Sequence, residues 1–170
     1  MNMTTIRKQA SFPVKADFLE ELQRLARMLK ERGIEPVSLS YRYGLGFATT
    51  RQGTDLKRLS EKDLLWIEQI NFDAGTFILS GMGEPQRSAF LHAAVFRHRS
   101  AAIFAVTVRV NGGDISRPKV SSSETAWLDQ VRVALNSGNA FTVDDTEVLS
   151  FGCTVDDAAA EIRDPQERLA

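Results

Sequence analysis

The chain has 170 residues, of which 43% are hydrophobic and 25% are charged, and its formal net charge is −1. This composition is ordinary for one soluble globular domain with its own core. The low net charge and the lack of a long basic block exclude a protein that binds nucleic acid through clustered Lys and Arg. No apolar run reaches membrane-spanning length. The N-terminus has no signal-like apolar core, so we expect a cytoplasmic protein.

The first part of the chain predicts an arm and an amphipathic helix. Residues 1–15 show no clear periodicity, and we interpret them as an N-terminal arm preceding a single domain over residues 16–170. We expect Asp17 to be the N-cap of the first helix and Gly33 to end it. The apolar stripe of this helix comprises Phe18, Leu22, Leu25 and Leu29.

Short strands and turns follow this helix. Alternating or β-branched residues predict strands over 37–41 and 47–50, and then a hairpin formed by 65–70 and 76–79. Ser60 and Asp63 have the spacing of a capping box. A Gly- and Pro-punctuated loop over 81–85 comes next. It leads into a helix with one buried stripe and then into a buried strand over 102–110.

The C-terminal third predicts two more helices around two strands. Ser123 can cap a helix whose apolar stripe includes Trp127 and Leu135. Residues 140–143 and 147–151 are expected to be strands, and Thr154 to cap the last helix. Strands joined by short turns favour antiparallel pairing, and the helices need a sheet face to cover. We therefore predict an α/β protein, a three-layer α/β/α domain with a mostly antiparallel central sheet.

The stretch from Gly81 to Val110 resembles the core of the class II aldolase/adducin family. That family has a Gly-x-Pro-Ser-Ser-Glu loop, a helix beginning near Leu-His, and a strand ending in His-x-His. Pro85 and the Leu91-His92 pair match this pattern. The catalytic Glu of the family falls on Ser88. Its two strand histidines, which are zinc ligands, fall on Ala105 and Thr107.

Two further blocks extend the resemblance to roughly residues 17–165. Gly53, Asp55, Leu59, Asp63 and Leu64 match the segment Ile-Thr-Pro-Ser-Gly-Val-Asp-x-x-x-Leu-Thr-x-x-Asp-Leu. Residues 148–158 resemble the family's final strand and helix. The third zinc histidine of the family precedes that strand, and its place here is near Thr146.

The resemblance places no zinc ligand in this chain. A catalytic zinc site needs three protein ligands and an open position, whereas the sequence has only His92 and His98. His92 matches a family position that is not a ligand, and we expect it to be a hydrogen-bonded core histidine. His98 lies between two arginines, whose charge disfavours a bound cation. We therefore predict no metal, no cofactor and no catalytic residue.

Polar residues remain at the positions that line the ligand cleft of the family. Arg87 lies at a loop–helix junction, where it could pair with a carboxylate or phosphate. The alternative is a solvated surface arginine. Ser38 takes the place of an Asn that helps to hold a ligand phosphate in the family, and Gln86 and Arg87 take those of the paired serines. The candidate ligand-binding residues are Ser38, Ser40, Gln52, Gly53, Gln86, Arg87 and Ser88.

Two functions follow from these predictions. The first is a class II aldolase/adducin-like domain without the zinc site that acts as a non-catalytic binding or assembly module. The second is a zinc-independent enzyme or sensor acting on a small phosphorylated or carboxylate ligand in the former cleft. A third option is that lyase activity persists, with the missing metal site supplied by a partner chain or by a metal ion that other molecules hold.

The resemblance also predicts a homo-oligomer, because class II aldolases form cyclic tetramers. Apolar residues in loops or at strand ends would leave exposed apolar area in a monomer, which often marks an interface. The residues concerned are Ile6, Phe12, Leu45, Phe47 and Phe72. The alternative is that these side chains fold back onto the core of their own domain.

Overall fold

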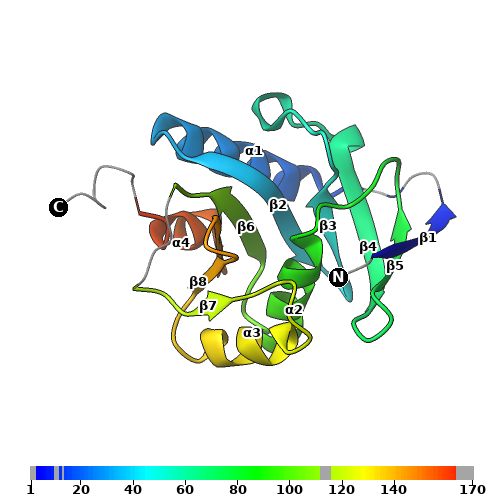
Figure 1. Ribbon diagram of the computed structural model, residues 1–170. Coiled ribbons are helices and arrows are strands. Elements are labelled where there is room, and N and C mark those ends of the chain that lie inside the picture. The colour runs from blue at the N-terminus through cyan, green and yellow to red at the C-terminus, as the bar shows by residue number, and fades with distance from the viewer. Residues whose placement is uncertain (1–2, 10–11, 13, 112–115, 164–170) are drawn as a thin grey trace.

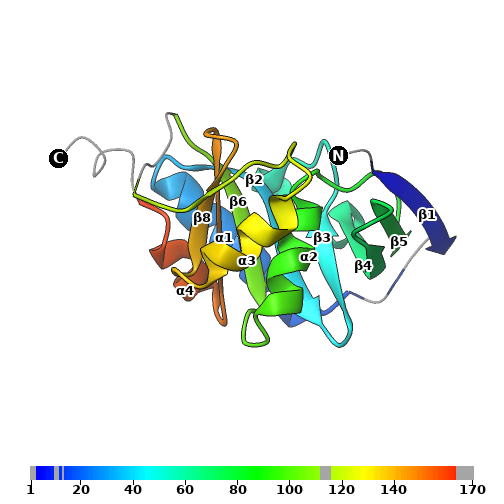
Figure 2. The ribbon, with the colours of Figure 1, turned by 60° about the horizontal axis from the view of Figure 1, so that its bottom comes forward.

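The computed structural model describes residues 3–9, 12, 14–111 and 116–163. These residues form a single mixed sheet of nine strands with α-helices on both faces (Figures 1 and 2). The strands are β1 (Thr4–Gln9), β2 (Glu35–Tyr43), β3 (Gly46–Thr50), β4 (Leu64–Asn71), β5 (Thr76–Ser80), β6 (Phe104–Arg109), β7 (Lys119–Val120), β8 (Ala140–Val143) and β9 (Glu147–Gly152). The helices are α1 (Ala16–Glu31), α2 (Ala89–His98), α3 (Trp127–Leu135) and α4 (Val155–Ala160), with short 3-10 turns η1 (Leu56–Arg58) and η2 (Glu61–Asp63).

The strand order is β1-β5-β4-β3-β2-β6-β9-β8-β7. All neighbouring strands are antiparallel except the two outermost pairs, β1 with β5 and β7 with β8. The predicted three-layer architecture with a mostly antiparallel sheet is therefore confirmed. No helix in the described part of the chain is both long and apolar enough to cross a membrane.

Each face of the sheet has its own core, and strand β2 contributes to both. Leu39 and Tyr41 point to the face that α1 and α4 cover, within one cluster of buried apolar residues. Ser38 and Ser40 point to the opposite face, where they contact α2. This alternation is the ordinary period of a strand. It places a row of hydroxyl groups beneath α2.

Helix α1 carries the predicted apolar stripe, although its N-terminus differs from the prediction. Leu22, Leu25 and Leu29 are fully buried. Asp17 is not the N-cap: the helix begins after Lys15, which has no side-chain capping bond, and Asp17 lies in the first turn. Gly33 follows the helix with φ +72°, the left-handed conformation that favours glycine after a helix end.

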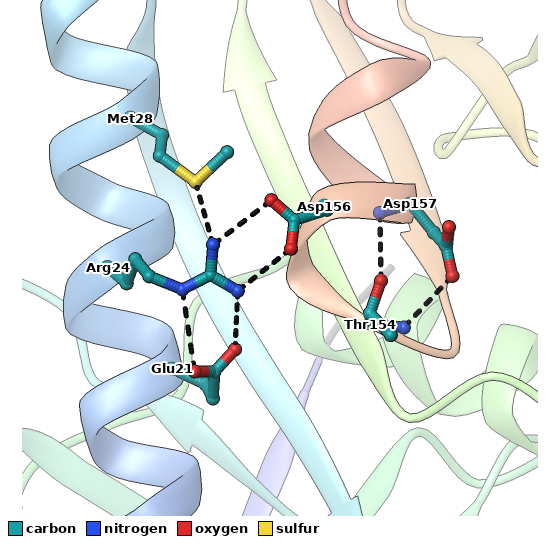
Figure 3. A network of polar contacts seen from close by, with 6 residues as sticks. All are labelled: Glu21, Arg24, Met28, Thr154, Asp156 and Asp157. Carbon is teal, nitrogen blue, oxygen red and sulfur yellow. Dashed lines mark hydrogen bonds and ion pairs between the residues drawn. The ribbon is translucent and has the colours of Figure 1, made fainter.

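Two arginines join helix α4 to α1: Arg32, at the end of α1, donates to the carbonyl of Ala159 at 3.0 Å, and Arg24 binds Asp156 (Figure 3). The guanidinium of Arg24 donates to both carboxylate oxygens of Asp156 at 3.0 and 2.9 Å, and also to Glu21. Thr154 and Asp157 form the capping box that begins α4. The predicted cap at Thr154 and the capping box of Ser60 with Asp63 are both confirmed.

Helix α2 is buried on all sides, which the predicted single stripe did not anticipate. Every residue from Ala89 to Phe96 is buried. The reason is that α2 lies between the sheet, which it meets at β2 and β6, and helix α3. His92 in the middle of this helix therefore has no route to solvent.

Two connecting segments also differ from the sequence prediction. Part of the predicted arm forms β1, in which Arg7 donates to the carbonyl of Gly83 at 2.7 Å and to the carbonyl of Gly81. Ser123 does not cap α3, whose N-cap position is Ala126 without a side-chain bond. A short sequence pattern could not predict β1, because that strand pairs with β5, which is distant along the chain.

Candidate functional site

The most unusual feature of the molecule is a histidine enclosed by hydroxyl groups. The antiparallel register places Ser40 of β2 opposite Thr49 of β3, and Ser38 opposite Thr107 of β6. All four side chains are fully buried, as is the imidazole of His92 on α2 above them. The sheet thus presents a polar patch to an otherwise apolar helix.

Both ring nitrogens of His92 are hydrogen-bonded within this patch. Nδ1 lies 2.6 Å from Ser40 Oγ, and Nε2 lies 2.8 Å from Thr107 Oγ1. Ser40 donates its only proton to Thr49 Oγ1 at 2.8 Å, so Nδ1–H must donate to Ser40. Nε2 then accepts from Thr107. The contacts therefore assign the neutral tautomer with its proton on Nδ1.

This arrangement makes His92 a poor proton acceptor near neutral pH. Burial lowers the pKa of His92 to about 3, because a charged imidazolium is strongly disfavoured without water. The surrounding hydroxyls carry no charge to compensate. The prediction that His92 is a hydrogen-bonded core residue is confirmed.

The positions aligned with the family's catalytic residues are part of the same packing. Ser88, at the catalytic Glu position, has its Oγ 2.6 Å from Ser38 Oγ. Ala105 is fully buried in the apolar core, and Thr107 is bound to His92. Thr146 is an exposed residue in the turn before β9.

These residues do not fit a zinc ion. A methyl group and neutral hydroxyls cannot replace the imidazole or carboxylate ligands that zinc prefers. Burial, followed by the charges of Arg132 and Arg97, lowers the pKa of His98 at the end of α2. The same two charges would repel a cation there. Across the described ranges no three His, Cys, Asp or Glu side chains are grouped as metal ligands.

Two of the seven candidate ligand-binding residues line a small cavity beside α2. The cavity has a volume of about 200 Å³, and Arg87 and Ser88 form one side of it. Arg87 is exposed, and its side chain has no hydrogen bond or ion pair with the described residues. The remaining lining residues are Leu91, Ser122, Val143, Asp144, Thr146 and Glu147.

Acidic groups face Arg87 across this cavity. Burial raises the pKa of Glu147, and the charge of Asp144 raises it further, whereas Arg109 and Arg87 lower it. The carboxylate of Asp144 accepts hydrogen bonds from the amide of Ser122, at 2.8 Å, and from its hydroxyl. The cavity is thus mixed in charge rather than uniformly cationic.

The other candidate residues lie outside that cavity. Ser38 and Ser40 are sealed within the His92 network. Gln52 donates from Nε2 to the carbonyl of Pro85 at 3.0 Å, so it is bound to the loop rather than free for a ligand. Gly53 is exposed with φ +74°, and Gln86 is half-buried. The structure therefore does not bring the seven residues together in one cleft.

The sequence alone did not reveal three residues whose hydrogen bonds hold the His92 network and the wall of the Arg87 cavity. Thr49 and Thr107 hold the His92 network, and Asp144 holds Ser122. A signal was present for Thr107, a polar residue between Val106 and Val108 in an apolar strand, but not for Thr49, whose neighbour Thr50 is also polar. Which strand faces which cannot be read from that pattern.

Comparisons with known proteins identify the fold. No family model and no curated protein matches the chain. Among solved structures, YgbL from Klebsiella pneumoniae superposes with a TM-score of 0.65 at 17% identity, covering 92% of this chain and 87% of that one. L-fuculose-1-phosphate aldolase from Thermus thermophilus gives 0.64 at 16% identity, covering 86% and 87%. The N-terminal class II aldolase domain of a conserved protein from Thermoplasma acidophilum gives 0.61 at 12% identity, covering 89% and 91%.

The chain therefore has the class II aldolase fold. The similarity extends over most of both chains in each comparison, so it concerns the whole domain rather than one motif. The resemblance inferred from the sequence is thereby confirmed at the level of the fold. Function does not follow from fold alone, so it must be argued from the side chains of this chain.

Proposed function

We propose that this chain is a non-catalytic binding or assembly module built on the class II aldolase fold and working without zinc. The observation that carries the proposal is the His92 network. It fills the space between α2 and strands β2 and β6 with neutral groups that satisfy one another. General acid–base catalysis needs a group that titrates near the working pH. The network supplies none.

The sugar-phosphate lyase activity that fuculose-phosphate aldolases carry out is the function to test against this proposal. We expect purified protein without a metal-affinity tag to hold no stoichiometric zinc. We also expect no cleavage of L-fuculose 1-phosphate above the buffer rate, with or without added Zn²⁺. About one tightly bound zinc per chain, or zinc-dependent turnover, would contradict the proposal.

A second candidate function is the binding of a small anion by Arg87. What favours it is a cationic side chain that lies on the wall of a cavity and makes no hydrogen bond or ion pair with the described residues. The cavity volume of about 200 Å³ is below the range of about 300–1,000 Å³ that is usual for drug-sized ligands. A small carboxylate or inorganic phosphate is therefore a better candidate than a sugar phosphate.

The test of this second function is a thermal-shift screen with small carboxylates and phosphates. A ligand that stabilises the wild type but not Arg87→Ala would support it, because stabilisation follows from binding to the native state. Arg97→Ala is a matched control, since Arg97 is an exposed arginine on α2, the helix that follows Arg87, but lies outside the cavity. Stabilisation lost equally in both variants would point to a general charge effect.

We also propose that the module is a homo-oligomer, and a tetramer by its resemblance to the class II aldolases. Leu45 is fully exposed at the tip of the β2–β3 turn, and Ile6 is 52% exposed on β1. The other three apolar residues predicted for an interface are less exposed to solvent. Phe47 is buried, and Phe12 and Phe72 are half-buried.

A further inference from the structure

A second cavity lies on the opposite face of the sheet from His92. Its volume is about 430 Å³, and it is bounded by the C-terminal part of α1, the start of β2 and the η1 turn. Helix α1 covers the face of β2 to which Leu39 and Tyr41 point. The His92 network lies on the other face. The two regions are therefore separated by the sheet itself.

The rim of this cavity carries an excess of positive charge. Arg27 and Lys30 come from one side of α1, three residues apart, and Lys57 comes from η1. All three are exposed, and none has an ion pair among the described residues. Of the two carboxylates in the lining, Glu35 is paired with Arg109 at 3.4 Å. The charge is local, because the chain as a whole is slightly negative.

The second carboxylate and the helix end do not cancel this charge. Asp55 is engaged as the cap of η1, where it accepts from the amide of Lys57 at 3.0 Å. A helix C-terminus ordinarily repels anions through its free carbonyl groups. Here the carbonyls of Leu29 and Lys30 accept from the amides of Ile34 and Gly33, both at 2.9 Å. The negative end of α1 is thus largely satisfied within the chain.

The floor of the cavity is apolar. Ala26 and Ile34 are buried members of the core, and Pro36 and Leu56 are half-buried beside them. The two walls are tied together, because Gln23 of α1 donates from Nε2 to the carbonyl of Leu59 at 2.8 Å, just beyond η1. An apolar floor with a few charged groups at its edge is the usual make-up of a small-molecule site.

We propose that this cavity binds a small amphipathic acid. The apolar body of the ligand lies on Ala26, Ile34 and Leu56, and its carboxylate, sulfonate or phosphate group pairs with Lys30 and Lys57. A neutral molecule of the same shape gains only the apolar contact. This inference goes beyond the proposed function, because it holds whether or not the His92 network is inert.

The test uses 8-anilinonaphthalene-1-sulfonate, an apolar aromatic anion that fluoresces when it leaves water. We expect saturable binding to the wild-type protein and displacement by octanoate but not by octanol. Lys30→Glu/Lys57→Glu should weaken the affinity roughly tenfold, since two favourable charge contacts become repulsive. Both side chains are exposed and unpaired, so the fold should persist, and its melting temperature is measured alongside.

The matched control is Lys62→Glu/Arg163→Glu, which makes the same change in net charge at two exposed residues outside the cavity. It should change the affinity by less than about twofold. Equal weakening in the two double variants would overturn the proposal, as would equal displacement by octanol and octanoate. An absence of saturable binding would overturn it too. Turnover of a sugar phosphate would contradict the non-catalytic function and leave this site standing.

Discussion

The Oγ1 atom of Thr107 lies 2.8 Å from Nε2 of His92, which joins the middle of β6 to the middle of α2. In the class II aldolase pattern, the position of Thr107 belongs to a zinc-binding histidine. Here the same position stabilises the packing of a helix on the sheet. This contact therefore contributes to the stability of the fold, which mutation and pH can test.

The first prediction concerns pH. The pKa of His92 is lowered from 6.5 to about 3 by burial, so the unfolded chain binds a proton more readily than the native one. Stability from the neutral imidazole is complete above pH 6.5 and falls as the pH drops toward 3. Within that window the free energy of unfolding should fall by about 1.4 kcal/mol for each pH unit of acidification. Urea unfolding between pH 5 and 7.5 measures it.

His92→Gln should be less stable than the wild type at pH 7.5 but lose less stability on acidification. The pKa of His98 is also lowered, so His98→Gln is measured in parallel. His92 is fully buried and His98 is not, so His92→Gln should remove the larger share of the slope. An unchanged slope in His92→Gln would refute the assignment of this pH dependence.

The second prediction concerns the bond between Thr107 and His92. Thr107→Val keeps the shape but leaves Nε2 with only Ser38 at 3.5 Å. The expected loss is about 1–3 kcal/mol in the free energy of unfolding, the cost of an unsatisfied buried group. A double-mutant cycle with His92→Leu isolates this contact, and we expect a coupling of at least about 0.5 kcal/mol. Additive effects would show that the two groups stabilise the fold independently.

The third prediction concerns the attachment of α4 to α1. The bond from Arg24 lowers the pKa of Asp156 below its ordinary value of 3.8. The stabilisation that the ionised Asp156 gives to the folded state is therefore present above pH 3.8 and is lost as the pH falls below that value. Asp156→Asn should speed amide exchange in α4 roughly twofold to fivefold at neutral pH, the range of an exposed ion pair. Added salt should reduce the difference.

Asp129→Asn is the control for this third experiment, because its partner Arg132 lies within the same helix α3 at 3.1 Å. It removes the same charge without touching the contact between α1 and α4. Exchange in α4 that responds equally to both variants would mean that net charge, and not the Arg24 contact, determines the effect.

The fourth prediction concerns self-association through Leu45. The side chain of Leu45 is fully exposed beside a groove of about 520 Å³ that Phe47, Ile67 and Phe96 help to line. We expect light scattering at micromolar concentration to give a multiple of 18.9 kDa. Leu45→Glu should shift the mass toward a single chain. Val133→Glu, at a residue 67% exposed on α3, should not. A wild-type mass of one chain that persists on concentrating would contradict the oligomer.

Local features of the sequence determined much of the fold. The apolar spacing of Leu22, Leu25 and Leu29 gave the buried side of α1, and the caps at Ser60 and Thr154 marked where η2 and α4 begin. These signals are reliable because they act within a few residues, through helical periodicity and short side-chain bonds. The short turns between the strands, and helices that need a sheet face to cover, then indicated the three-layer architecture.

The tertiary structure alone decided what the polar residues do. Ser38 and Ser40 were predicted to face a ligand, whereas the register of β2 with β3 and β6 places them against Thr49, Thr107 and His92. The same applies to Arg7, which holds the carbonyl of Gly83 from a segment predicted to be an arm. Such contacts join residues far apart in the chain, and a one-residue change of register would turn each strand side chain to the other face. The sequence therefore determines which hydroxyl groups are present, whereas the pairing of the strands determines which atom each of them binds.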